Sequence, residues 1–186
     1  SLTTLPEIYA TTLANSCYAH MFAGCTSLTT IPSGYLHATN LSGASYCYRG
    51  MFEDCTSLTT IPSNLLPATN LYTSENGECV YYSMFSGCTS LTTIPSGLLP
   101  ATSLYPLCYD SMFAGCTSLT TVPSDLLPAT TLANGCYNRM FEGCTSLTTV
   151  PSNLLPATTL AIYCYGSMFK DCTSLTSSPV LPASQL

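Results

Sequence analysis

Cysteine is the residue type in this chain with the widest range of possible chemistry. Twelve cysteines stand in six pairs, and seven residues separate the two members of each pair, or eight in the pair of Cys79 and Cys88. Zinc sites instead use closely spaced Cys-x-x-Cys knuckles, and only His20 and His37 could add nitrogen ligands. We therefore expect no metal centre. An even number of cysteines is compatible with disulfides in an extracellular protein.

Whether each pair is bridged depends on the backbone between its members. If residues 136–143 are helical, the Cα atoms of Cys136 and Cys144 lie about 12 Å apart at the helical rise per residue. That separation exceeds the ~6.8 Å limit for a disulfide. The cysteines would then be free thiols that pack in ladders as small hydrophobic residues. If the segment is not helical, disulfides become the favoured alternative.

Other residues give little support for catalysis or cofactor binding. His20 and His37 occupy positions that no other repeat fills with histidine, so neither belongs to a recurring pair of nucleophile and base. Glu75 and Glu78 form a close acidic pair, but calcium requires more oxygen ligands than two. There is no glycine-rich phosphate loop and no dinucleotide fingerprint. The sequence therefore predicts a protein that is not an enzyme and has no cofactor.

An internal repeat dominates the sequence. A Met-Phe pair starts at Met21, Met51, Met84, Met112, Met140 and Met168, with spacings of 30, 33, 28, 28 and 28 residues. A fixed period of this size is typical of a solenoid. Residues 1–186 are predicted to form one solenoid domain of about six units. Because the sequence opens and closes inside a repeat, we expect a segment of a longer array whose uncapped ends can self-associate.

Each unit is expected to contain a short strand and a short helical turn. The run Leu119–Val122 contains β-branched residues that suit a pleated surface, and equivalent runs would form a parallel ladder. Cys136, Met140, Phe141 and Cys144 fall at i, i+4, i+5 and i+8, which indicates one face of a helical turn. A Gly or Asp before the second cysteine of each pair would end that turn in the left-handed conformation. Stacking in register would bury each Phe and Leu between its equivalents in adjacent units.

The composition excludes two classes of partner. Charged residues make up 6% of the chain, far below the ~25% of ordinary globular proteins. The net charge is −6, and the three basic residues, Arg49, Arg139 and Lys170, form no stripe that could neutralise phosphates, so nucleic-acid binding is not expected. No apolar run approaches the ~20 residues of a membrane helix. The sequence therefore predicts no membrane span.

Two units are longer than the others at one point, between the Leu of Ala-Thr-x-Leu and the next Cys. Most units have three residues there, whereas Ser42–Tyr46 has five and Tyr72–Glu78 has seven, and one more residue is added between Cys79 and Met84. Stacking would place the two insertions side by side at one edge, where loops commonly carry binding residues. The alternative is drift in a loop that tolerates length changes. The predicted binding residues are Tyr46, Tyr72, Glu75, Asn76, Glu78, Tyr81 and Tyr82.

The repeated words Phe-x-Gly-Cys-Thr-Ser-Leu-Thr-Thr-Ile-Pro, Leu-Pro-Ala-Thr-x-Leu and Cys-Tyr-x-x-Met-Phe resemble the BspA-like leucine-rich repeats of bacterial surface proteins. The resemblance covers essentially the whole chain. It implies a right-handed solenoid of the leucine-rich-repeat type, β-rich, with a short parallel strand and a short helical turn in each unit of ~28 residues. The longer unit and the two insertions depart from the usual spacing of that family and leave the curvature open.

The resemblance also implies a function. It predicts a non-enzymatic recognition or adhesion module, extracellular or at a bacterial cell surface, that binds a protein or a glycan. The alternative is a structural rod or filament that self-associates end to end. These two functions differ in solution, because a recognition module stays monomeric whereas a rod forms open-ended polymers.

Overall fold

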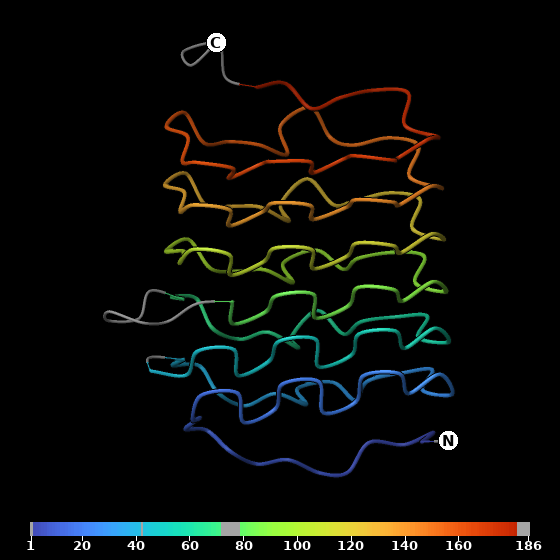
Figure 1. The fold of residues 1–186 in the computed structure, drawn as a ribbon, viewed down its shortest axis with the longest axis vertical. Coiled ribbons are helices and arrows are strands. Elements are labelled where there is room, and N and C mark those ends of the chain that lie inside the picture. Colours follow the sequence, from blue (N-terminus) through green and yellow to red (C-terminus); the bar gives the residue numbers. More distant parts are fainter. Residues whose placement is uncertain (1, 42, 72–78, 182–186) are drawn as a thin grey trace.

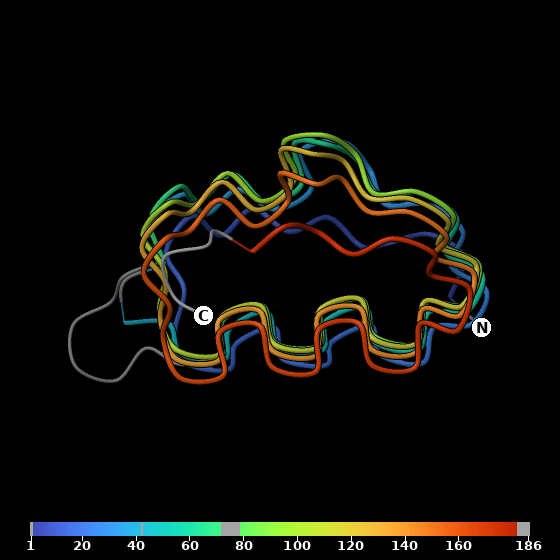
Figure 2. The same ribbon diagram turned by 90° about the horizontal axis from the view of Figure 1, so that it is seen from above.

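The computed structural model describes residues 2–41, 43–71 and 79–181. The chain winds into successive units that stack along one axis, with the earliest and latest described residues at opposite ends of the stack (Figure 1). Seen along that axis, equivalent parts of the units superpose, and each unit has two long sides (Figure 2). One side has a stepped backbone, and the other carries the Leu-Thr-Thr words.

The stepped side consists of six nine-residue segments, here called the turn face: residues 16–24, 46–54, 79–87, 107–115, 135–143 and 163–171. The first, fifth and ninth residue of each segment has a positive φ, as at Gly135, Arg139 and Gly143. Alternate backbone N–H groups close turns within the unit, such as Glu142 N–H to Arg139 O at 3.1 Å. The N–H groups between them donate to the next unit, such as Gly143 N–H to Lys170 O at 2.8 Å.

The predicted helical turn at Cys136–Cys144 is therefore wrong. An α-helix directs every N–H to the carbonyl four residues earlier, whereas half of the N–H groups here bond the neighbouring unit. A left-handed residue at every fourth position also interrupts a right-handed helix. The left-handed conformation expected before the second cysteine is present, at Gly143 and at Asp171, but it ends a series of turns and not a helix.

The opposite side, here called the return side, consists of residues 28–41, 58–71, 91–104, 119–132 and 147–160. Isolated parallel β-bridges join Thr93 to Thr121 and Thr121 to Thr149, so that one residue of each of three successive units is paired. The predicted β-rich fold of the leucine-rich-repeat type is wrong, since residues 2–41, 43–71 and 79–181 contain no helix and no strand longer than a single bridging residue. Hence no helix in this part of the chain could cross a membrane.

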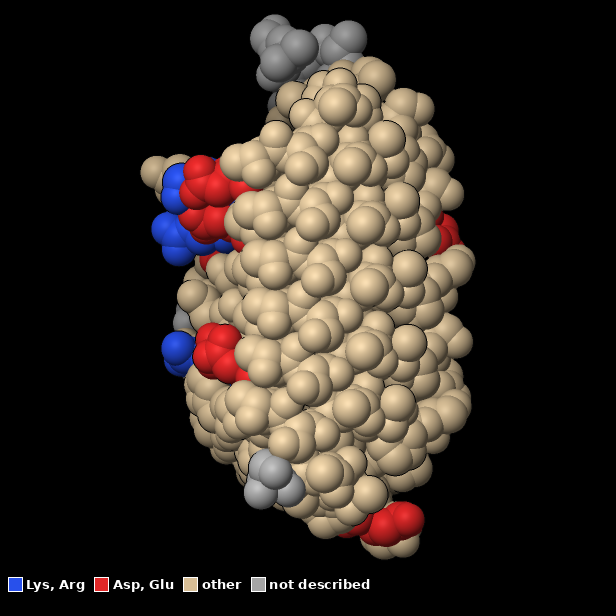
Figure 3. Space-filling model, turned by 90° about the vertical axis from the view of Figure 1, so that its right-hand side faces the viewer, with Lys and Arg blue, Asp and Glu red and all other residues tan. Residues whose placement is uncertain are grey.

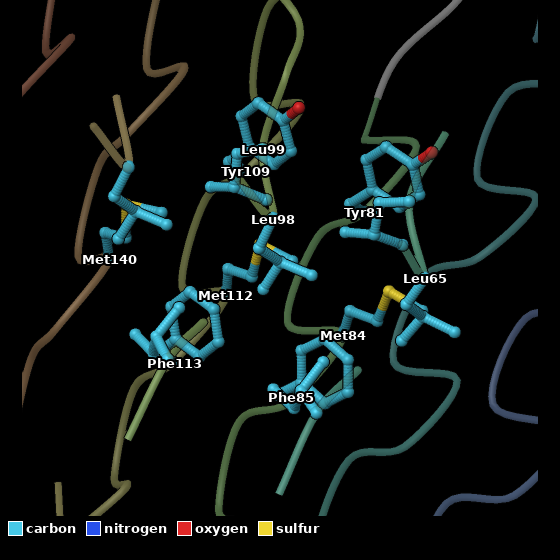
Figure 4. Close-up of a cluster of buried hydrophobic side chains, with 14 of the residues drawn as sticks. Leu65, Tyr81, Met84, Phe85, Leu98, Leu99, Tyr109, Met112, Phe113 and Met140 are labelled. Atoms are coloured by element: carbon cyan, nitrogen blue, oxygen red, sulfur yellow. The ribbon is translucent and has the colours of Figure 1, made fainter. Parts of the chain in front are cut away.

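Two columns of aromatic rings run through the stack. They are Phe22, Phe52, Phe85, Phe113, Phe141 and Phe169, and Tyr18, Tyr48, Tyr81, Tyr109, Tyr137 and Tyr165. Neighbouring ring centroids lie 5.6 to 5.9 Å apart in the phenylalanine column and 5.6 to 6.0 Å apart in the tyrosine column. Figure 4 shows Tyr81 beside Tyr109 and Phe85 beside Phe113. The predicted stacking of Phe141 between its equivalents is confirmed, and Leu147 is fully buried.

All twelve cysteines are free thiols, although the backbone between them is not helical. The second cysteine of a pair bonds the previous unit, as Cys144 Sγ donates to Phe113 O at 3.2 Å. Tyr18 N–H of the first unit bonds Cys47 O of the second, whereas the corresponding bond from Tyr48 N–H of the second unit goes to Val80 O of the third. Val80 thus fills a cysteine position, which accounts for the extra residue between Cys79 and Met84.

Candidate binding edge

Two positions of the turn face differ from unit to unit. In the word Cys-Tyr-x-x-Met they hold exposed Arg49 in one unit and exposed Arg139 in another, but buried Asp110 and Ser111 in the unit between Met84 and Met140. The flanking Tyr and Met are buried in these units. In Figure 3, the basic side chains lie along the left-hand edge together with several acidic ones, further acidic side chains lie at the right-hand edge and at the bottom, and the centre of the face is neutral. The turn face therefore displays varied side chains on a repeated backbone.

Two of the predicted binding residues meet at this edge. The Arg49 guanidinium lies 5.9 Å from the Tyr46 ring centroid and 5.1 Å from that of Tyr82, within the range of a cation–π interaction. Tyr81 is instead buried in the tyrosine column, so its side chain does not reach the surface. Tyr72, Glu75, Asn76 and Glu78 lie outside the described residues.

Nearer the last units, the turn face has a groove of about 370 Å³. It crosses three units and is lined by Pro106, Leu107, Asn134, Gly135, Asn138, Arg139, Ile162, Tyr163, Gly166 and Ser167. Two glycines keep it open. A Cβ at Gly135 would come within 2.6 Å of the Leu107 side chain, and one at Gly166 within 2.7 Å of Asn138 Oδ1. The volume falls within the range of small-ligand sites.

The walls of the groove combine apolar and polar groups. The Tyr163 side chain is 76% exposed and that of Ile162 66%, which is unusual for residues so large. Arg139 lies beside them and forms a loose ion pair with Glu142, with 3.7 Å between Nε and Oε2. Glu142 also pairs with Lys170 of the next unit. These contacts raise the pKa of the Lys170 ammonium through its hydrogen bond to Glu142 and the attraction of that carboxylate.

A buried carboxylate fixes one polar wall. Asp110 is only 3% exposed. Its two carboxylate oxygens accept hydrogen bonds from Ser111 Oγ at 2.6 Å and from Asn138 Nδ2 at 2.8 Å. The Asn138 amide is therefore held in one orientation. On the same edge, Asn134 Oδ1 accepts a hydrogen bond from Ile162 N–H at 3.1 Å, which ties successive units together.

The thiols behind this edge have no environment that would activate them. Burial raises the pKa of Cys136 to about 12 and that of Cys144 to about 12. A nucleophilic cysteine needs the thiolate form at neutral pH. In the part of the chain that the structure describes, no group of three or more His, Cys, Asp or Glu could hold a metal ion.

Searches among protein families, curated proteins and solved structures found nothing that matches this chain. The resemblance to the BspA-like repeats thus rests on the sequence words alone.

The sequence did not single out the groove, although one signal was available. In the repeats from Cys88 onward, the two positions held by Asn138 and Arg139 differ from unit to unit, while the Cys-Tyr and Met-Phe letters on either side of them are constant. The length changes between units indicate the two insertions instead.

Proposed function

We propose that this chain is a non-enzymatic recognition module that binds glycans in the groove between Pro106 and Ser167. The observation that carries the proposal is the presence of the exposed Tyr163 ring beside Asn138 and Arg139 on a backbone fixed by neighbouring units. An aromatic ring offers a face for the apolar side of a sugar, and amide and guanidinium groups donate to its oxygens. The preset Asn138 amide lowers the ordering cost of binding.

Charge favours acidic sugars over neutral ones. Arg139 is more than half exposed, and its pairing with Glu142 is long, so a sugar carboxylate could take a bidentate contact with the guanidinium. Neutral sugars would use the ring and the amide groups only. An extracellular or cell-surface location belongs to the same proposal and rests on the resemblance to the BspA-like repeats.

The test is binding of the chain to a panel of neutral and acidic oligosaccharides, followed by calorimetry on any that bind. Tyr163→Ala should weaken binding by about tenfold or more, and Tyr9→Ala is the matched control because Tyr9 is 73% exposed and lies outside the groove. Arg139→Gln should weaken acidic sugars more than neutral ones, with Arg49→Gln as its control. Equal affinities for Tyr163→Ala and the unchanged chain would contradict the proposal. If no sugar binds, a protein ligand is the alternative.

A further inference from the structure

In the last described unit of the turn face, five backbone N–H groups occupy the positions that bond the following unit elsewhere in the stack. In the preceding unit, Gly135, Tyr137, Arg139, Phe141 and Gly143 donate to the carbonyls of Ile162, Cys164, Gly166, Met168 and Lys170, at 2.7 to 3.0 Å. Their equivalents in the last unit are Tyr163, Tyr165, Ser167, Phe169 and Asp171. These five N–H groups donate to nothing among the described residues.

The first unit has the complementary row. Carbonyls of the second unit, at Ser45, Cys47, Arg49, Met51 and Glu53, accept from the first unit at 2.7 to 3.0 Å. Their equivalents in the first unit are Asn15, Cys17, Ala19, Met21 and Ala23. These five carbonyls accept no hydrogen bond from any described residue. Donors therefore face one end of the stack and acceptors face the other.

Apolar surface accompanies both rows. Met21 is 44% exposed, whereas its equivalents Met51 and Met140 are fully buried and Met168 is 3% exposed. At the opposite end, a hollow of about 420 Å³ is lined by Leu155, Tyr165, Ser167, Met168, Phe169, Lys170, Ser178, Pro179 and Leu181. The hollow contains the outermost methionine and both outermost rings of the columns. A further unit with Tyr, Met and Phe at the usual places would cover it.

We propose that the end face around Tyr165 and Phe169 binds the end face around Tyr18 and Phe22 of a second copy of this chain. The register follows from the internal units. Asp171 N–H would donate to Ala23 O, Phe169 N–H to Met21 O and Ser167 N–H to Ala19 O. In the same register, Tyr165 N–H would donate to Cys17 O and Tyr163 N–H to Asn15 O. Met21 of the second copy would pack on Met168, in the place that the methionine of a further unit would take. This partner goes beyond the glycan proposed for the groove, although the backbone N–H groups of two groove residues, Tyr163 and Ser167, belong to the donor row.

The contact has a direction. Two donor faces cannot bond each other, and neither can two acceptor faces, so only head-to-tail association extends the ladder. A heterologous contact of this kind does not close on itself unless the rotation per copy forms a ring. The structure therefore assigns open-ended growth, with the groove repeated once per copy along the outside.

Two variants, each blocking one face, test both the contact and its direction. Met21→Lys places an ammonium where the interface would bury a thioether, and Leu181→Lys does the same in the hollow of the other face. Both residues are already partly exposed, so the variants should fold, and thermal unfolding checks this. Met21→Leu is the matched control that keeps the face apolar.

Sedimentation velocity over a range of concentrations gives the readout. The unchanged chain and Met21→Leu should grow in mass with concentration, while each lysine variant alone should stay monomeric. An equimolar mixture of the two lysine variants should give a dimer and nothing larger, since one open face of each kind remains. A lysine variant that dimerises alone would show a symmetric contact and overturn the direction. An unchanged chain that stays monomeric at all concentrations would overturn the proposal.

Discussion

The turn face and the return side bind adjacent units in different ways. Five backbone hydrogen bonds, at 2.7 to 3.0 Å, join N–H groups in residues 107–115 to carbonyls in residues 134–142 of the next unit. On the return side of the same units, the Leu-Thr-Thr words contribute one backbone bond, from Thr148 N–H to Thr120 O at 3.2 Å. Yet the return side has the words that repeat almost letter for letter, and the turn face has the variable ones.

This contrast separates two requirements on sequence. A backbone ladder needs only N–H and C=O groups, so the residues along it can vary outwardly without loss of rigidity. The return side has few such bonds and depends on the fit of buried side chains, such as Leu119 and Leu147, against identical neighbours. The side whose residues vary is therefore the side with more backbone hydrogen bonds between units, and a varied surface on a rigid backbone suits recognition.

The largest expected effect comes from breaking an aromatic column behind the turn face. Phe113 is fully buried between Phe85 and Phe141, so Phe113→Ala should lower the free energy of unfolding by about 3–5 kcal/mol. Thr120→Ala on the return side is the control, because the side chain is exposed and the change should stay within about 0.5 kcal/mol. Urea unfolding measures both. A small effect at Phe113 would place the ring outside the cooperative core.

Alkaline pH should destabilise the thiol ladders behind the turn face. An unfolded cysteine ionises near its ordinary pKa of about 8.5, whereas burial raises the pKa of Cys47 to about 12 and that of Cys136 to about 12. The folded state thus retains protons that the unfolded state loses. Stability from these thiols is complete below about pH 8.5 and falls between there and pH 12, by about 1.4 kcal/mol per pH unit for each thiol.

Thermal unfolding from pH 7 to pH 10 measures this slope. Cys136→Val is the matched variant, since Val80 already fills the equivalent position in the third unit. The variant should lose less stability than the unchanged chain over the same range. Parallel curves for the two proteins would mean that Cys136 does not contribute to the loss.

A smaller effect is expected from the left-handed glycines of the turn face. Gly115 has φ of 71°, and a Cβ there would meet only the Gly87 backbone, at an ordinary contact distance of 3.7 Å. Gly115→Ala should therefore cost only the conformational penalty, about 1–2 kcal/mol. Ala114→Gly tests the neighbouring position, where no positive φ is required. If the two variants unfold alike in urea, the left-handed residue does not constrain the turn.

Sequence alone predicted the stacking of rings such as Phe141 and the left-handed residue at Gly143. The helical turn was wrong because Cys136, Met140 and Cys144 recur at intervals of four, and nine residues are too few to distinguish that interval from 3.6. The strand was wrong because β-branched residues suit an extended run whether or not it is paired. Sequence variation marks some of the groove residues, but the groove itself depends on space that Gly135 and Gly166 leave across separate units, which only the stacking of the units reveals.

The smallest expected effect, and one of opposite sign, concerns the hydroxyl groups of the tyrosine column. The Tyr109 hydroxyl is buried and has no hydrogen-bond partner among the described residues, and burial raises the pKa of this tyrosine well above its ordinary value. A buried hydroxyl without a partner costs free energy that a phenylalanine does not. Tyr109→Phe should therefore leave the free energy of unfolding unchanged or raise it by about 1 kcal/mol.

The reciprocal variant Phe113→Tyr adds a hydroxyl to the phenylalanine column and should lower the free energy of unfolding by about 1–3 kcal/mol. A clear loss of stability in Tyr109→Phe, measured by urea unfolding, would show that the hydroxyl has an acceptor and that the tyrosine column is stabilised by more than ring packing.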